Sequence, residues 1–254
     1  MFSFFNKKRE KEQEVDSDVT GSLSITTDIH SHILPGIDDG SPDIETSLRL
    51  VKGIYNLGIR KSIATPHVIS DMFRNTPETI NAALNKLKEA CTNAGIDIEL
   101  SAAAEYMLDD YFVTLLATDK SQLLKIHGNI ILTEQSYATP TGNLNEIAFE
   151  LITQGFKPIM AHPERYFYYH DDHENFYHLK DMGFLLQVNL LSLIGYYGPA
   201  VTKAAKFLFK ENLVDLVGTD MHHLKHLALL QKKENQHLWQ QYFEGKMYND
   251  LSQI

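Results

Sequence analysis

Seven short apolar runs alternate with segments of helical periodicity along this chain of 254 residues. Such alternation predicts parallel strands joined by right-handed helical crossovers, which is an α/β fold. The length suits one large domain, and both an open sheet and a closed barrel agree with the periodicity. The predicted strands cover residues 24–29, 61–65, 97–104, 129–134, 157–161, 184–189 and 213–219.

Start and stop residues mark the helices between these strands. Ser41-Pro42 supplies an N-cap and a first-turn proline for a helix that ends before Gly58. Thr76-Pro77 opens a second helix, which ends before Gly95 and carries Cys91 on its apolar face. The spacing predicts further helices over 106–117, 142–154, 173–182, 199–211 and 222–240.

The charge and cysteine content exclude several classes of protein. Lys and Arg number 23 against 33 Asp and Glu, and the net charge of -10 argues against a nucleic-acid partner, which needs a basic face. One cysteine allows no intrachain disulfide and favours a reducing compartment. No apolar run approaches the ~20 residues that span a membrane. We therefore expect a cytoplasmic protein without a transmembrane segment.

The first 22 residues differ from the rest of the chain. They are rich in charges of mixed sign and end in Thr20-Gly21-Ser22. Such a composition predicts a flexible tail. We expect residues 1–22 to precede a single domain over 23–254.

Nearly every predicted strand ends in His, Asp or Glu. The carboxyl ends of the strands of a parallel barrel meet at one mouth, so these side chains are expected to gather there. In the first motif two histidines flank one residue, and the turns at Pro35-Gly36 and Asp39-Gly40 can fold a carboxylate back towards them. The candidate metal ligands are His30, His32, Asp39, His67, Glu105, His162, Asp220 and His222.

This set mixes imidazoles with carboxylates and contains no thiolate. Such donors suit manganese, iron or zinc at catalytic sites, whereas structural zinc usually recruits cysteine. Eight candidates exceed the needs of one ion, so two or three divalent ions are expected. Clusters of this kind hydrolyse phosphate esters or amides by generating hydroxide near neutral pH.

Five separate motifs make a family resemblance specific. In chain order they are DIHSHILPGIDDGS at 28–41, ATPH at 64–67, Glu105-Tyr106, AHPER at 161–165 and TDMH at 219–222. Together they resemble the polymerase-and-histidinol-phosphatase (PHP) superfamily. Within it the chain is most similar to the bacterial metal-dependent protein-tyrosine phosphatases of capsule and exopolysaccharide operons, the CpsB/YwqE type.

The resemblance implies a distorted (β/α)7 TIM-like barrel with a trinuclear, manganese-loaded site at the carboxyl ends of its strands. It places His30, His32, Glu105 and Asp220 around one ion, with Glu105 bridging towards a second. Asp39, His67, His162 and His222 then complete the other two positions.

The same resemblance implies the catalytic groups. Arg165 binds the phosphoryl oxygens, as a guanidinium fork can, and His162 and Asp220 act beside it. The family usually carries a second arginine after the Asp-x-His motif, whereas this chain has His223-Leu224-Lys225-His226. Lys225 or His226 is the candidate to take that place.

The activity implied is hydrolysis of phosphotyrosine in a protein, with a bacterial tyrosine autokinase as the natural partner. Two alternatives stay open, namely a phosphoesterase for a small substrate such as histidinol phosphate and a catalytically weak metal-binding regulatory module. A cysteine nucleophile is excluded, because the position six residues after Cys91 is Asp97 where a phosphate loop needs arginine. Glu134 and Asn189 also end strands, either as supports for ligands or as ordinary hydrogen-bonding groups.

Overall fold

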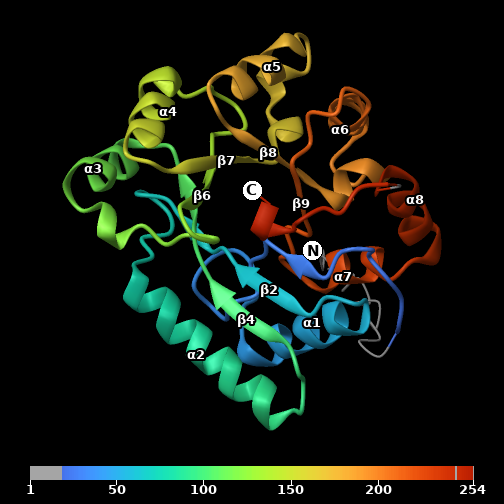
Figure 1. Ribbon diagram of the computed structural model, residues 1–254. Coiled ribbons are helices and arrows are strands. Elements are labelled where there is room, and N and C mark those ends of the chain that lie inside the picture. The colour runs from blue at the N-terminus through green and yellow to red at the C-terminus, as the bar shows by residue number, and fades with distance from the viewer. Residues whose placement is uncertain (1–18, 244, 254) are drawn as a thin grey trace, which may run out of the picture.

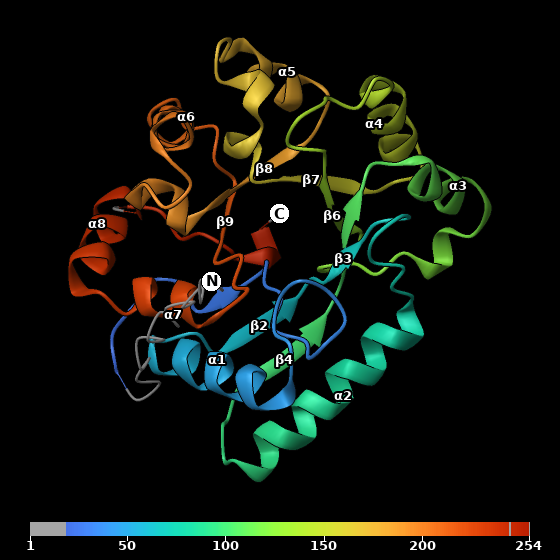
Figure 2. The ribbon, with the colours of Figure 1, turned by 180° about the vertical axis from the view of Figure 1, so that it is seen from behind.

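The computed structural model describes residues 19–243 and 245–253, which form a ring of parallel strands surrounded by helices (Figures 1 and 2). Two pairs of its short strands continue one another, so the strands fill seven positions around the ring. In chain order they are β1 (Thr27–Asp28), β2 (Lys61–Ala64) with β3 (His67–Val68), β4 (Glu99–Ala102) with β5 (Glu105–Met107), β6 (Ile130–Glu134), β7 (Lys157–Ala161), β8 (Leu185–Asn189) and β9 (Leu216–Gly218).

Backbone hydrogen bonds close this ring. One sheet has the order β1-β2-β4 and the other the order β3-β5-β6-β7-β8-β9, and every pairing within them is parallel. The two ends meet where Ser31 pairs with Met221. There His32 N–H donates to Met221 O at 2.9 Å, and Asp220 N–H donates to His30 O at 2.9 Å. These contacts confirm the predicted distorted (β/α)7 barrel and exclude the alternative of an open sheet.

The predicted strands 61–65 and 97–104 are present as β2 and β4, and each is followed by a short strand that was not predicted. Pro66 has no N–H to give to the ladder, so it separates β2 from β3. Its carbonyl instead accepts from Glu105 N–H at 3.1 Å. The strand predicted over 97–104 is shorter at both ends, because β4 runs from Glu99 to Ala102, and β5 begins at the buried Glu105.

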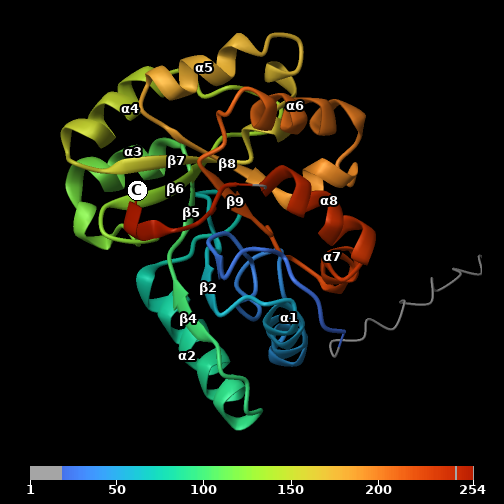
Figure 3. The ribbon, with the colours of Figure 1, turned by 45° about the vertical axis from the view of Figure 1, so that its right-hand side comes forward.

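Most predicted helices are present with shifted ends. They are α1 (Ile44–Asn56), α2 (Pro77–Asn93), α3 (Asp110–Thr118), α4 (Leu144–Thr153), α5 (Glu174–Asp181), α6 (Pro199–Lys210), α7 (Leu224–Leu230) and α8 (Lys233–Phe243). Figure 3 shows α1 and α2 together on the side of the barrel that carries β2 and β4.

Three helix predictions need correction. Ser41 does not cap the first helix, because Asp43 caps α1 by accepting from Thr46 N–H, while Ser41 N–H donates to His32 O in the preceding loop. Residues 106–109 are not helical, since Tyr106 stays in β5 and Asp109 caps α3. The helix predicted over 222–240 is two helices, and the Gln236 side chain donates to the carbonyls that end the first one.

A small apolar cluster fills the barrel below the mouth. Most of the strand positions contribute to it, with Ile29, Ile63, Leu132, Ile159, Ala161 and Leu216 among its buried members. Leu251 packs against this cluster from the end of the described chain, which Figure 1 shows near the centre of the ring. Asn249 ties the same segment to both closing strands, since its Nδ2 donates to Thr27 O at 2.8 Å and to Val217 O at 2.9 Å.

The predicted tail is only partly within the described residues. Residues 1–18 lie outside them, while Gly21 N–H donates to Asn56 O at 3.1 Å and Ser22 N–H donates to Gln236 Oε1 at 3.2 Å. The segment just before residue 23 is thus attached to the barrel, and the division into tail and single domain stays a prediction. None of the described helices is long and apolar enough to cross a membrane.

Candidate metal centre

All eight candidate ligands converge at the carboxyl ends of the strands. Their side chains form overlapping groups with ligand atoms within 4.8 Å of one another, and two of these groups share Glu105. We divide the eight into an inner group and an outer group. The inner group is His30, His32, Glu105, His162 and Asp220, all of them buried, and the outer group is Asp39, His67 and His222.

The inner group has the spacing of donors around one ion. His30 Nε2 lies 3.3 Å from His32 Nε2 and 3.3 Å from Glu105 Oε2. Both histidine nitrogens lie 3.4 Å from Asp220 Oδ1. Donors placed tetrahedrally at metal–ligand distances of roughly 2.0–2.2 Å are separated by about 3.3–3.6 Å. His30, His32 and Asp220 therefore have the mutual spacing of donors around one divalent cation, and Glu105 Oε2 lies at a similar distance from both imidazoles.

Three buried carboxylate oxygens without hydrogen-bond donors support this fit. They are both side-chain oxygens of Glu105 and Oδ1 of Asp220, and none of them accepts a hydrogen bond from the described residues. Burial opposes ionisation of both groups, yet the charge of nearby His30 holds the pKa of each carboxyl well below its usual range. Buried ionised oxygens without donors are costly unless a cation pairs with them.

His162 faces the second oxygen of the shared carboxylate. Its Nε2 lies 3.0 Å from Glu105 Oε1, on the side of Glu105 away from His32. Burial lowers the pKa of His162 to about 4, so the ring is neutral near pH 7, as a metal ligand must be. Glu105 can therefore bridge two cation positions.

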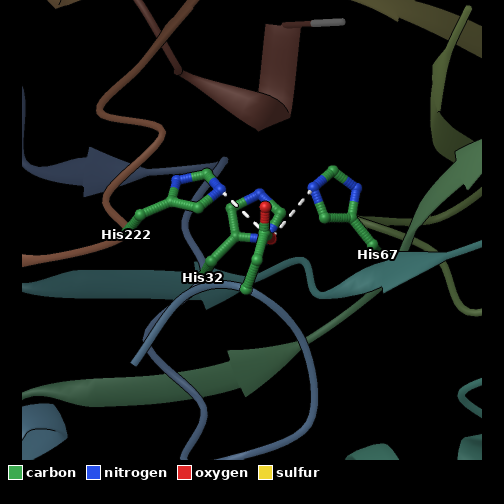
Figure 4. A group of neighbouring side chains, drawn as sticks. His32, His67 and His222 are labelled. Atoms are coloured by element: carbon green, nitrogen blue, oxygen red, sulfur yellow. Dashed lines mark ion pairs between the residues drawn. The ribbon is translucent and has the colours of Figure 1, made fainter. Parts of the chain in front are cut away.

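The outer group lies closer to the surface. Asp39 Oδ1 is 3.5 Å from His67 Nε2 and 3.6 Å from His222 Nε2. Figure 4 shows the rings of His222, His32 and His67 around one point, and the rings of His32 and His222 stack at 4.0 Å. The Asp39 side chain is 57% exposed, so solvent reaches this part of the cluster.

Hydrogen bonds to Nδ1 orient four of the five rings. His30 Nδ1 lies 2.7 Å from Gln187 Oε1, and His32 Nδ1 lies 2.8 Å from Asp38 Oδ2. His67 Nδ1 pairs with Glu134 Oε1 at 2.8 Å, and His222 Nδ1 pairs with the carbonyl of Asp220 at 2.9 Å. A proton fixed on Nδ1 leaves the Nε2 lone pair free for a metal.

The backbone is adapted to this convergence. His162 and Asp220 have φ of 34° and 48°, a left-handed conformation that is costly for residues with a side chain. Gly40 is required for a different reason, since a Cβ there would lie 2.1 Å from the carbonyl oxygen of His32. Backbone strain at two candidate ligands and the close approach of Gly40 to His32 thus both occur within the cluster.

Arg165 lies at the edge of the inner group. Its Nη1 donates to Asp220 Oδ2 at 2.8 Å, and its guanidinium lies 4.5 Å from the ring centre of Tyr137 and 4.2 Å from that of Tyr197. The two rings hold the guanidinium plane without using its N–H donors. The side chain is 20% exposed, so donors remain accessible from the mouth.

The segment that replaces the expected second arginine behaves differently. Lys225 is exposed on α7, and its Nζ lies 5.5 Å above the ring of Tyr196. His226 is buried, and its Nδ1 accepts from His222 N–H at 3.2 Å. His226 therefore supports the loop of a ligand, and a phosphate-binding role for Lys225 stays a prediction.

Sequence reasoning did not single out several neighbours of the ligands. Gln187 and Asp38 orient rings, and Tyr137 and Tyr197 flank Arg165. The sequence contained an indication of two of them. Asp38 lies within the first ligand motif, and Gln187 lies two residues before the end of a strand. The two tyrosines lie in loops whose approach depends on the tertiary fold.

Comparison with known proteins agrees with the geometry. The family model for capsular polysaccharide synthesis, CpsB/CapC, matches residues 26–249. The chain belongs to the CpsB/CapC family. The tyrosine-protein phosphatase YwqE of Bacillus subtilis is 30% identical over 199 residues, which cover 78% of each chain. The tyrosine-protein phosphatase CpsB of Streptococcus pneumoniae is 28% identical over 205 residues, covering 78% of this chain and 83% of that protein.

Solved structures of the CpsB/CapC family share the fold. A chain from the crystal structures of YwqE from Bacillus subtilis and CpsB from Streptococcus pneumoniae, unique metal-dependent tyrosine phosphatases, matches with a TM-score of 0.74. That match has 26% sequence identity and covers 87% of this chain and 96% of the other. An amidohydrolase from Mycoplasma synoviae, with a TM-score of 0.50 and 15% identity, shows the barrel fold alone.

Proposed function

We propose that this chain is a metal-dependent tyrosine-protein phosphatase that acts on a tyrosine-phosphorylated protein of capsule or exopolysaccharide synthesis. The observation that supports this most is the buried set of imidazoles and carboxylates beside Arg165, in which three carboxylate oxygens accept no hydrogen bond from the described residues. Metal dependence and tyrosine phosphatase activity are named together for relatives in the same family.

The eight candidate ligands hold two or three divalent ions in this proposal, with manganese foremost and iron or zinc as alternatives. Bound ions of this kind polarise phosphoryl oxygens and lower the pKa of water. His30, His32, Asp220 and Glu105 would hold one ion, and Glu105 with His162 would contribute to a second position. The outer group completes the set towards solvent.

Arg165 binds the phosphoryl oxygens of the substrate. Asp220 and the two tyrosine rings fix its guanidinium, so little ordering remains to be done when substrate binds. Donors held in place stabilise negative charge on the phosphoryl group as the P–O bond breaks. The exposed Asp39 corner allows a phosphorylated tyrosine on a protein surface to reach the cluster.

His162 acts as a ligand rather than as a general acid. Because burial lowers the pKa of His162 to about 4, its ring is a neutral imidazole near neutral pH and not the imidazolium that a general acid requires. The departing tyrosine oxygen becomes a phenolate, whose ordinary pKa of about 10 lets it leave with little help. We expect solvent near the exposed edge to complete its protonation.

A tyrosine autokinase is the proposed source of the phosphoprotein, and Lys225 is the proposed additional cation for its phosphorylated segment. The test uses purified protein loaded with Mn²⁺ and compares a phosphotyrosine peptide, p-nitrophenyl phosphate and histidinol phosphate. Higher kcat/KM for the peptide than for histidinol phosphate supports the proposal. Preference for histidinol phosphate, or metal content without turnover of any aryl phosphate, contradicts it.

A further inference from the structure

Two buried side-chain amides connect His30 to Asp220. Gln187 and Asn189 lie two residues apart on β8, so both side chains point to the same side of the strand. Gln187 Oε1 is 2.7 Å from His30 Nδ1, and Gln187 Nε2 donates to Asn189 Oδ1 at 2.9 Å. Asn189 Nδ2 then donates to Asp220 Oδ2 at 2.7 Å. Both amides are 0% exposed.

The hydrogen bonds in this chain can run in only one direction. Asp220 Oδ2 also accepts from Arg165 Nη1, and an ionised carboxylate offers only acceptors. Asn189 must therefore present its amide nitrogen to Asp220 and its oxygen to Gln187. Gln187 must in turn present its oxygen to His30, because its nitrogen is used on Asn189. The His30 ring is thus required to carry its proton on Nδ1.

From this we infer that Gln187 and Asn189 are positioning residues for the inner cation position, acting as a directed hydrogen-bond relay. One end of the relay fixes the tautomer of His30 and turns its Nε2 towards the cluster. The other end occupies Oδ2 of Asp220 and leaves Oδ1 for the cation. The inference rests on the metal-dependent function proposed above.

Three observations distinguish the relay from ordinary core packing. Asp220 Oδ1 has no hydrogen-bond partner among the described residues and lies 3.4 Å from His30 Nε2, as the relay requires. Gly218 makes room for it, since a Cβ there would lie 2.8 Å from Gln187 Nε2 and 2.8 Å from His30 Cβ. The backbone N–H of Asn189 donates to Glu164 Oε1 at 2.9 Å, which fixes the strand end that carries the relay.

The relay also differs in charge from the groups that orient His32 and His67. His32 and His67 are oriented by the carboxylates of Asp38 and Glu134, whereas His30 is oriented by a neutral amide. A carboxylate at position 187 would add negative charge beside Glu105 and Asp220. A neutral acceptor selects the tautomer without that addition.

The test compares Gln187→Met and Asn189→Leu with the wild-type protein. The control is Gln135→Met, because Gln135 is an equally buried amide that bonds Tyr169 and Thr141 and no candidate ligand. Mn²⁺ affinity is measured by competition with a chelator. We expect Gln187→Met and Asn189→Leu to weaken the tightest Mn²⁺ site by roughly 10–100-fold, as loss of an outer-shell partner does, and Gln135→Met to leave it within about twofold.

A second readout reports the tautomer directly. In protein loaded with Zn²⁺ as a diamagnetic probe, nitrogen-15 spectra are expected to show a protected His30 Nδ1–H. Gln187→Met should lose this protection. Gln187→Glu keeps an acceptor for His30 Nδ1–H and should retain the protection. The Glu variant also keeps the inference testable if Gln187→Met does not fold. Unchanged Mn²⁺ affinity and an unchanged Nδ1–H signal in the relay variants would overturn the inference. Wild-type protein that binds Mn²⁺ but cleaves no phosphotyrosine overturns only the proposed function.

Discussion

The inner and outer groups of the cluster use the same residue types in opposite environments. The side chains of His30, His32 and Glu105 are 0% exposed. In the outer group, His67 is 10%, His222 16% and Asp39 57% exposed. Donor spacing follows the same division, with 3.3–3.4 Å around His30 and His32 and 3.5–3.6 Å around Asp39.

This difference separates two tasks. A buried group with fixed rings and unpaired carboxylate oxygens is preorganised to retain an ion, because few side chains must be reordered on binding. A group that includes one exposed carboxylate, as Asp39 is here, is open to solvent and exchanges its ligands more easily. We therefore expect the inner position to bind metal more tightly than the outer position.

The largest expected effect comes from removing the inner group. His30→Ala/His32→Ala deletes two of the four donors around one position. Phosphotyrosine hydrolysis should fall by on the order of 10³-fold or more, because several kcal/mol of transition-state stabilisation is lost. Bound metal, measured by mass spectrometry, should fall in parallel while circular dichroism shows retained fold. Full activity in this double variant would contradict the site assignment.

Arg165→Lys tests the residue that we propose binds the phosphoryl group beside the inner group. Lysine keeps the charge but loses the planar fork that both tyrosine rings and Asp220 hold. We expect kcat on p-nitrophenyl phosphate to fall by roughly 10²–10³-fold, as for the loss of one fixed donor, with metal content unchanged. A change in KM alone would show that Arg165 contributes only uniform binding.

Asp39→Asn tests the outer group by itself. It keeps the shape of the side chain and removes the charge that faces His67 and His222. The weakest metal position should lose affinity by at least the roughly 10-fold that loss of an outer-shell partner costs, while the tightest position stays unchanged. Titration of the chelated protein with Mn²⁺ measures both. Equal weakening of all positions would remove the distinction between the two groups.

Acidity should weaken metal binding, and His67 shows how this works in the outer group. Burial lowers the pKa of His67, but the negative charges of Glu105 and Glu134 raise it overall to about 9 in the metal-free protein. Below that pH a proton competes with the cation for this ring, so affinity should rise with pH and level off above about 9, with a slope of roughly tenfold per pH unit. Proton release during Mn²⁺ titration at pH 8 measures this competition, and its absence would contradict it.

The smallest effect is expected far from the cluster. Burial raises the pKa of the Cys91 thiol to about 11, which keeps it protonated and unreactive. Treatment of the folded protein with iodoacetamide should leave phosphatase activity unchanged, and Cys91 should be alkylated only after denaturation. Inactivation that Cys91→Ala abolishes would reopen the possibility of thiol chemistry.

The sequence predicted the mouth of the barrel better than its edges. The eight candidate ligands follow apolar runs, and parallel strands bring such positions together whatever the exact ends of the strands. The short strand β3 after Pro66 and the capping of α1 by Asp43 were missed, and the first of these depends on pairing with the distant strand β5. The position of Ser41 is set by a hydrogen bond to His32 rather than by helix capping.

Supporting residues were predicted unevenly for the same reason. Glu134 and Asn189 were candidates because they end strands, and the structure places them against His67 and Asp220. Gln187 lies two residues before the end of its strand. A polar residue at that position gave no functional signal by itself, because its role depends on the approach of β9. The pairing of Arg165 with Tyr197 requires two loops to meet, and local sequence contains no such information.

The bond between Asn249 and the closing strands has a consequence for synthesis of the protein. The Asn249 side chain bonds both Thr27 and Val217. Asn249 follows Thr27 by 222 positions, so this contact forms only when almost the whole chain has been synthesised. His30 emerges from the ribosome early, but Asp220, its partner at the inner position, follows β9 late. We therefore expect only a nearly complete chain to bind metal with full affinity. A nascent chain that stops before β9 lacks Asp220 and thus has an incomplete inner group.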